Sequence, residues 1–113
     1  MTGAMMSIAI SLTPAHAQNR PIVDGNAWYE RCWDSALNTQ ALCHGYALGV
    51  VDALQVWKNT APDTAPACIP SGIASSQLRD IGLQYIATRT KERHKPASEL
   101  LISAFQEQWP CKK

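Results

Sequence analysis

The segment from Cys43 to Trp57 constrains the fold most, because it predicts one long helix with two faces that need partners. At helical spacing its apolar residues form a stripe of Tyr46, Val50, Ala53, Leu54 and Trp57. Gly45 and Gly49 lie one turn apart on a second face, which Ala53 continues. Each glycine costs a helix interior about 1 kcal/mol relative to alanine, and close packing of a neighbouring backbone offsets that cost. We therefore expect another helix to cover this strip; fraying at Gly45 is the alternative.

The first seventeen residues have the pattern of a secretory signal peptide. Residues 4–12 are a short apolar run, and Ala15 and Ala17 fit an A-x-A cleavage site. The alternative is a buried N-terminal helix, since the run is too short to span a bilayer. Residues 1–17 contain no Lys or Arg, whereas a signal peptide normally begins with a positively charged region. A translation start upstream of Met1 would account for this difference. The prediction is an exported, soluble domain of residues 18–113.

Composition limits the partners of this domain. The 113-residue chain has 46% hydrophobic and 17% charged residues, as an ordinary globular protein does. Its net charge of +1 gives no reason to expect nucleic acid or an anionic membrane surface as a partner. Beyond the leader, no segment approaches the roughly 18 apolar residues of a membrane span.

Four amphipathic helices and no strand alternation predict a small all-α bundle. Asp24 or Asn26 caps the first helix, whose buried face carries Trp28, Cys32 and, in one register, Ala36. The second helix extends from about 40 to 58, with Asn38 or Thr39 as its cap.

Two proline-containing connections separate the later helices. Residues 59–67 cannot be helical throughout, and the third helix follows from about 75 to 88, or from a cap at Ser71. Its apolar face comprises Ile73, Leu78, Ile81, Tyr85 and Ile86. Pro96 fits the first turn of the fourth helix, which Pro110 ends. The apolar stripe of that helix is Leu100, Leu101, Ala104, Phe105 and Trp109.

Four cysteines in a short exported chain predict two disulfides, although three connectivities are possible. If the third and fourth helices form an antiparallel hairpin, Cys68 before it and Cys111 after it lie side by side. We therefore pair Cys68 with Cys111 and, by elimination, Cys32 with Cys43. No Cys-x-x-Cys occurs, so a zinc site is the weaker interpretation.

Few residues of the sequence have side chains and neighbours suited to catalysis. After the leader the histidines are His44 and His94, and no serine lies in a Gly-x-Ser-x-Gly elbow. His44 is a candidate general base, but we favour a surface or capping role. Asp52 is expected to be a partly exposed hydrogen-bond acceptor rather than a catalytic group. We predict no enzyme, no cofactor and no metal site.

The remaining polar and aromatic clusters have structural interpretations. The basic run from Arg89 to Lys95 could meet an acidic partner, but Glu92 interrupts it and we favour a solvated connection. Trp57 and Trp109 fall on apolar stripes, which predicts core packing for both.

The sequence resembles the Rap/Tai-type immunity protein family over nearly the whole mature chain. The resemblance rests on Cys-x-Gly-Tyr-x-x-Gly-Val-x-Asp from Cys43 to Asp52, on Cys68-Ile69-Pro70 followed by Gln77-Leu78, and on Trp109-Pro110-Cys111. It implies a small exported helical protein associated with type VI secretion. Residues matching the family pattern, which we expect to be structural, are the four cysteines, Gly45, Tyr46, Gly49, Asp52, Trp109 and Pro110.

The resemblance also implies a function. Relatives are periplasmic, often dimeric, and bind a peptidoglycan-cleaving amidase effector, which they inhibit to protect the producing cell. The alternative is a general envelope protein, such as a helical stress chaperone or a binding module without a toxin partner. The effector-contacting surface matches no motif, so the two connections 58–67 and 88–95 are our candidates. Their partner-binding candidates are Lys58, Asp63, Arg89, Lys91 and Arg93.

Overall fold

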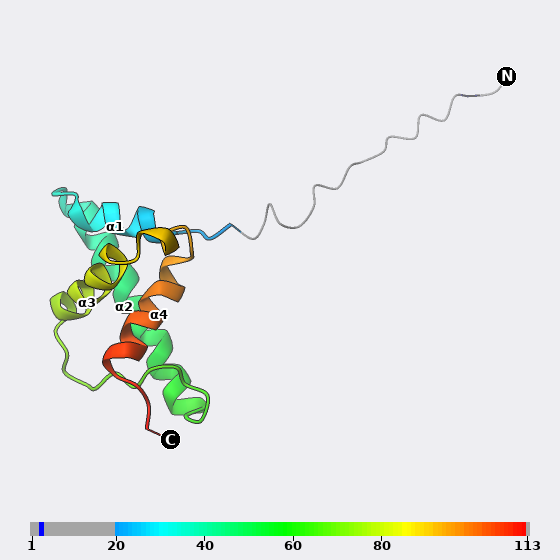
Figure 1. Cartoon of the computed structure of the whole chain (residues 1–113), viewed down its shortest axis with the longest axis vertical. Coiled ribbons are helices and arrows are strands. Elements are labelled where there is room, and N and C mark those ends of the chain that lie inside the picture. The colour runs from blue at the N-terminus through cyan, green and yellow to red at the C-terminus, as the bar shows by residue number, and fades with distance from the viewer. Residues whose placement is uncertain (1–2, 4–19, 113) are drawn as a thin grey trace.

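The computed structural model describes residue 3 and residues 20–112, and within them the chain forms four α-helices and one 3-10 turn (Figure 1). The predicted signal peptide, residues 1–17, lies outside the described residues except for Gly3. The four-helix, all-α architecture is therefore confirmed for the part of the chain that is described. No helix in this part is long and apolar enough to cross a membrane.

Helix α1 spans Gly25–Trp33 and starts as predicted. The Asp24 side chain accepts a hydrogen bond from the Ala27 N–H at 2.8 Å, which satisfies one of the unpaired donors of the first turn. Trp28 and Cys32 are buried, whereas Ala36 lies beyond the helix and is exposed. The first helix thus buries the predicted face but ends before Ala36.

Helix α2 spans Leu37–Thr60, which is longer at both ends than predicted. The prediction that Asn38 or Thr39 caps it was wrong, because Ala36 is the capping position and makes no side-chain cap bond. The reversal from α1 is made instead by Asp34, whose carboxylate accepts from the Ala36 N–H at 2.9 Å. Gln40 holds the turn closed by donating to the carbonyls of Cys32 and Asp34.

Helices α3 (Ser75–Ala87) and α4 (Ala97–Gln108) form the second half of the bundle, with the 3-10 turn η2 (Thr90–Glu92) between them. The earlier start at Ser71 is not adopted, since α3 begins after Ala74. Pro96 occupies the position just before α4 rather than its first turn. There it forms an isolated antiparallel bridge with Asp24, which ties the start of α4 to the start of α1.

The core lies where the four helices meet, around the fully buried side chains of Trp28, Ile86, Leu101 and Phe105. The Trp28 indole N–H donates to the carbonyl of Cys43 at 3.0 Å, so the largest core residue has no unpaired polar group. Of the predicted apolar faces, Leu78 and Ile86 of α3 are buried. So are Leu100, Leu101, Ala104 and Phe105 of α4.

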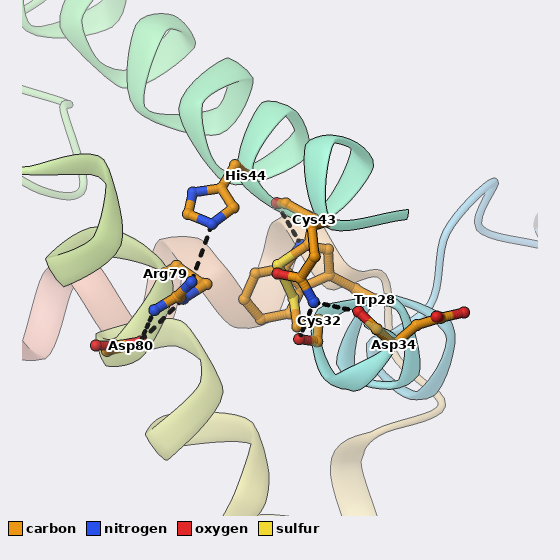
Figure 2. Close-up of a disulfide and its surroundings, with 8 residues drawn as sticks. Trp28, Cys32, Asp34, Cys43, His44, Arg79 and Asp80 are labelled. Carbon is orange, nitrogen blue, oxygen red and sulfur yellow. Dashed lines mark hydrogen bonds and ion pairs between the residues drawn. A yellow bond between two sulfur atoms is a disulfide. The ribbon is translucent and has the colours of Figure 1, made fainter. Parts of the chain in front are cut away.

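Both disulfides have the predicted connectivity. Cys32–Cys43 joins α1 to α2 beside Trp28, and its two cysteines are buried (Figure 2). Cys68–Cys111 joins the segment before α3 to the segment after α4, and the Cys68 N–H donates to the Trp109 carbonyl at 2.9 Å. The hairpin geometry that predicted the second bridge is therefore present.

Two predictions for α2 were wrong. Among residues 20–112, a Cβ at Gly45 or Gly49 would meet no heavy atom within 4 Å outside the neighbouring turns of α2, so none of the described helices covers the strip. Trp57 is 43% exposed, and its indole N–H donates to the Thr64 hydroxyl rather than packing in the core. The reason is that α1, α3 and α4 pack against one side of α2, where Cys43, Ala47 and Leu54 are buried.

Candidate protein-binding surface

The C-terminal end of α3 is capped by two arginines from the connection that follows it. Arg93 donates from Nε to the Ile86 carbonyl at 3.1 Å and from Nη2 to the Ala87 carbonyl at 3.2 Å. Arg89 donates from Nη1 to the Tyr85 carbonyl at 3.4 Å. The last carbonyls of a helix lack intrahelical partners and carry partial negative charge, so two guanidinium groups are well placed there.

Each of these arginines also lies over a tyrosine ring. The Arg89 guanidinium is 3.6 Å from the ring centroid of Tyr85, and that of Arg93 is 4.4 Å from the ring centroid of Tyr29 on α1. Tyr29 in turn meets Trp33 edge to face, with centroids 6.0 Å apart, and Trp33 is 68% exposed. We call these five residues the aromatic–arginine surface.

Acidic residues temper the positive charge of this surface. Glu107 of α4 pairs with Arg89 at 3.0 Å, and Glu92 lies 3.8 Å from the same guanidinium. Glu92 also pairs with Lys95 at 3.0 Å, and the hydrogen bond from Lys95 lowers the pKa of the Glu92 carboxyl. The surface therefore combines large planar side chains with locally balanced charge, unlike a basic patch.

A shallow hollow of about 370 Å³ between α3 and α4 adjoins this surface. Arg89 and Tyr85 form part of its wall, and Glu107 faces them from α4. Because the hollow is open and has a mixed polar and apolar lining, it suits a protruding protein segment better than an enclosed small molecule. The other lining residues are Ile81, Gln84, Thr88, Ala104 and Gln108.

The structure divides the predicted partner-binding residues into two groups. Arg89 and Arg93 belong to the aromatic–arginine surface, and Lys91 is exposed beside them on η2. Lys58 lies in the last turn of α2, and Asp63 is exposed in the turn that follows. The C-terminal end of α2 and the turn that follows it lie at the opposite end of the helical body from the connection between α3 and α4 (Figure 1).

Three residues of the aromatic–arginine surface were not predicted from the sequence as partner-binding residues. The sequence predicts Tyr85 as part of the apolar face of the third helix and indicates no role for Tyr29 or Trp33. The available signal was the spacing of Tyr29 and Trp33, which puts two aromatics on one helix face. The proximity of Tyr29 to Arg93 is a tertiary contact between residues far apart in sequence, and no local sequence pattern predicts it.

The residues that match the family pattern differ in how far they are exposed to solvent. Gly45, Gly49, Asp52 and Pro110 are exposed, whereas Tyr46 is partly buried against the core. Trp109 is also partly buried and stacks on Phe105, with centroids 6.4 Å apart.

His44, the candidate general base, forms a link between α2 and α3 (Figure 2). Its Nε2 lies 3.0 Å from Nη1 of Arg79, which pairs with Asp80 at 2.9 Å. A guanidinium group only donates, so Nε2 accepts in this contact and the ring proton is on Nδ1. The histidine is thus oriented by a cation, and the contact holds α3 against the start of α2.

The fold and this surface define the class: a small, disulfide-linked, all-helical protein with the surface composition of a protein binder. A family model described as Rap1a immunity proteins matches residues 24–111, and the chain belongs to this family. No curated protein and no solved structure gave a significant match. Membership implies an immunity function through binding of an effector protein, in a family that is generally non-enzymatic. Together with the two disulfides it indicates an extracytoplasmic protein.

Proposed function

We propose that this protein is a periplasmic immunity protein that binds a peptidoglycan-cleaving amidase delivered by type VI secretion. It inhibits the amidase by covering the active-site cleft. In this proposal the N-terminal segment directs export, and the two disulfides form after export.

The exposed Trp33 carries this proposal. A tryptophan that is 68% exposed and braced by Tyr29 presents a large apolar area whose conformation is already restricted. Tryptophan, tyrosine and arginine are the residues that most often dominate the binding energy of protein interfaces. Trp33, Tyr29 and Arg93 unite these three types at one site. This composition supports a protein partner.

The neighbouring charges support a specific orientation of that partner. Arg89 is held between Tyr85 and Glu107, so its side chain loses little further freedom when a partner binds. The hollow between α3 and α4 offers a recess for a loop at the rim of the amidase cleft. Trp33 and the η2 connection would then lie over the cleft itself.

A pull-down tests the proposal. The oxidised protein is used as bait with envelope extract from its source bacterium, and captured proteins are identified by mass spectrometry. We expect one dominant partner with amidase activity on purified peptidoglycan, and loss of that activity at a near-equal ratio of the two proteins. A scrambled-disulfide preparation of the same chain is the control for non-specific capture.

Two outcomes would contradict the proposal. A single partner whose peptidoglycan-cleaving activity is unchanged by saturating bait would rule out inhibition. Many weakly held clients, with suppressed aggregation of unrelated proteins, would favour the envelope-chaperone alternative.

A further inference from the structure

The two disulfides differ in how far solvent reaches them. Cys43 is fully buried and Cys32 is 7% exposed, so the bridge between them lies in the core beside Trp28 (Figure 2). Cys68 and Cys111 are each only partly buried. A thiolate opens a disulfide by attacking one of its two sulfurs, so the reaction requires access to a sulfur. In the folded protein the Cys68–Cys111 bridge is therefore the one within reach of a reductant.

A hollow of about 320 Å³ leads to this bridge. The hollow lies where the end of α2 and the C-terminus come together, at the opposite end of the body from the connection between α3 and α4 (Figure 1). Its lining residues are Pro62, Asp63, Ala65, Cys111 and Lys112. Since Cys111 belongs to this wall, it forms the accessible half of the bridge.

The charges of the hollow permit approach of a thiolate. The attacking group is an anion, so nearby charges affect its rate of attack. Lys112 follows Cys111 directly, and Asp63 lines the hollow from the turn after α2. Lys58, in the last turn of α2, is a further cation near this turn. The lining itself carries one cation and one anion, so it has no net charge to repel the thiolate.

The backbone beside the two bridges also differs. Cys32 and Cys43 lie within helices, and their carbonyls accept further bonds from the side chains of Gln40 and Trp28. Residues 65–70, which contain Cys68, belong to none of the described helices. Among the described residues, their one backbone-to-backbone hydrogen bond runs from the Cys68 N–H to the Trp109 carbonyl. Such a segment has backbone groups available for pairing with another protein.

We propose that the Cys68–Cys111 bridge is an exchange site for a thioredoxin-like dithiol protein, and that Cys32–Cys43 is not. The thiolate of the dithiol protein attacks Sγ of Cys111, the bond between the two sulfurs breaks, and Cys68 leaves as a thiolate that takes up a proton. The second thiol of the dithiol protein then gives up its proton and displaces Cys111 from the mixed disulfide. The dithiol protein ends as a disulfide, and its two protons and two electrons are on Cys68 and Cys111.

Several contacts near the bridge do not depend on its sulfur atoms. The Cys68 N–H donates to the Trp109 carbonyl at 2.9 Å, and the Trp109 ring stacks on Phe105. The Gln55 side-chain N–H donates to the Ile69 carbonyl at 3.1 Å. These contacts keep the ends of the α3–α4 hairpin together when the bridge opens, so exchange does not require the helices to unfold.

Reduction of the folded protein tests this proposal. Thioredoxin, kept reduced by its reductase and NADPH, is added to the protein with both bridges closed. Samples are quenched with acid and alkylated, and mass spectrometry identifies the modified cysteines. We expect Cys68 and Cys111 to be alkylated at least about tenfold faster than Cys32 and Cys43, which are the internal control. Dithiothreitol acting on the protein in urea should open both bridges and shows that all the cysteines are detected.

Trapping of the mixed disulfide tests the direction of attack. A thioredoxin whose second active-site cysteine is replaced by serine stops after the first step. We expect it to be joined to Cys111. A bond to Cys68 would overturn the assignment of Cys111 as the accessible sulfur.

Reversal of one charge tests the role of the hollow. Lys112→Glu leaves two carboxylates in the lining and should slow reduction at least about threefold at low salt, with a smaller effect at high salt. Lys91→Glu makes the same change on η2, at the opposite end of the body, and is the matched control. Equal rates in the two variants would contradict entry through this hollow.

These measurements contain no effector, so their result is independent of the proposed function. Simultaneous opening of both bridges would overturn the proposal, and so would a folded protein in which neither bridge opens. Loss of helical circular dichroism as the Cys68–Cys111 bridge opens would show that unfolding exposes it. We expect thioredoxin to discriminate between the two bridges at least about threefold more strongly than dithiothreitol does, because it also needs the segment 65–70. Equal discrimination would overturn docking on that segment.

Discussion

At the residue scale, glycines in α2 and α3 serve opposite purposes. Gly82 is buried, and the space of its missing side chain is filled by Trp28 and Leu101. Gly49 is exposed, and no atom of the described part of the chain, apart from the neighbouring turns of α2, lies within 4 Å of that space. The same residue type therefore marks a packed helix contact in one case and an uncovered surface in the other.

This difference predicts opposite effects of alanine on stability. Gly82→Ala forces a methyl group against core side chains that are fully buried, so we expect the free energy of unfolding to fall by at least about 1 kcal/mol. Gly49→Ala gains helix propensity without a clash and should raise it by about 1 kcal/mol. Urea unfolding of each variant, measured against the wild type, compares the two. Equal effects of the two substitutions would contradict the packing described around Gly82.

At the element scale, the two disulfides connect segments of different separation. Cys32–Cys43 closes 11 residues and Cys68–Cys111 closes 43. The latter bridge holds both ends of the α3–α4 hairpin, where the chain has no strand or helix to anchor it. Cys68 and Cys111 are only partly buried, so most of the effect of this bridge comes from the unfolded state.

Removal of the longer bridge therefore gives a quantitative prediction. On the chain-entropy model, Cys68→Ser with Cys111→Ser should lower the free energy of unfolding by about 4 kcal/mol. The double variant is compared with the oxidised wild type by guanidinium unfolding, and the m-value should rise because the unfolded chain expands. A loss below about 1 kcal/mol would show that the reduced chain keeps this contact in its unfolded state.

The 3-10 turn η2 gives a pH-dependent prediction. Its Glu92 accepts a hydrogen bond from Lys95, which lowers the pKa of the carboxyl below its ordinary value of 4.5 and raises the pKa of Lys95. Because the folded pKa of Glu92 is the lower one, its stabilising contribution is present above pH 4.5 and is lost as the pH falls through the folded pKa. The groups are exposed, so the change in stability is small.

Carboxyl-carbon NMR titration measures this pKa directly. We expect Glu92 to titrate below 4.5 in the wild-type protein, and Lys95→Met to move its pKa upward toward that value. Lys91→Met, a change on an exposed neighbour, is the matched control and should have a smaller effect. An unchanged Glu92 pKa in Lys95→Met would contradict the contact.

At the scale of the whole molecule, local signals predicted the bundle but not its surface. The Asp24 cap, the apolar stripes of α3 and α4 and both disulfides followed from spacing and hairpin geometry. The prediction that Asn38 or Thr39 caps α2 was wrong because side-chain hydrogen bonds of Asp34 and Gln40 form the turn before the helix. Helical periodicity shows which residues share a face but not whether that face is covered. For this reason, it could not predict that Trp57 and the glycine strip are exposed.

The candidate binding surface was harder to predict for a related reason. Arg89 and Arg93 were candidates because they lie in an exposed connection, but their aromatic neighbours come partly from α1, more than fifty residues earlier. The contact depends on the bridge between Asp24 and Pro96, which brings α1 beside the connection. Such a surface is a property of the packed bundle rather than of any motif.

The most direct test of the central claim compares two tryptophans in effector binding. Trp33→Ala removes the most exposed anchor of the aromatic–arginine surface, and Trp57→Ala removes a partly exposed tryptophan from the far part of α2. The affinity of each variant for the captured amidase is measured by calorimetry, after circular dichroism shows both to be folded. We predict that Trp33→Ala weakens binding at least about thirtyfold, as loss of a hot-spot tryptophan does, and that Trp57→Ala leaves it within about threefold of wild type. Unchanged affinity in Trp33→Ala, or a larger loss in Trp57→Ala, would contradict the assignment of this surface to the effector.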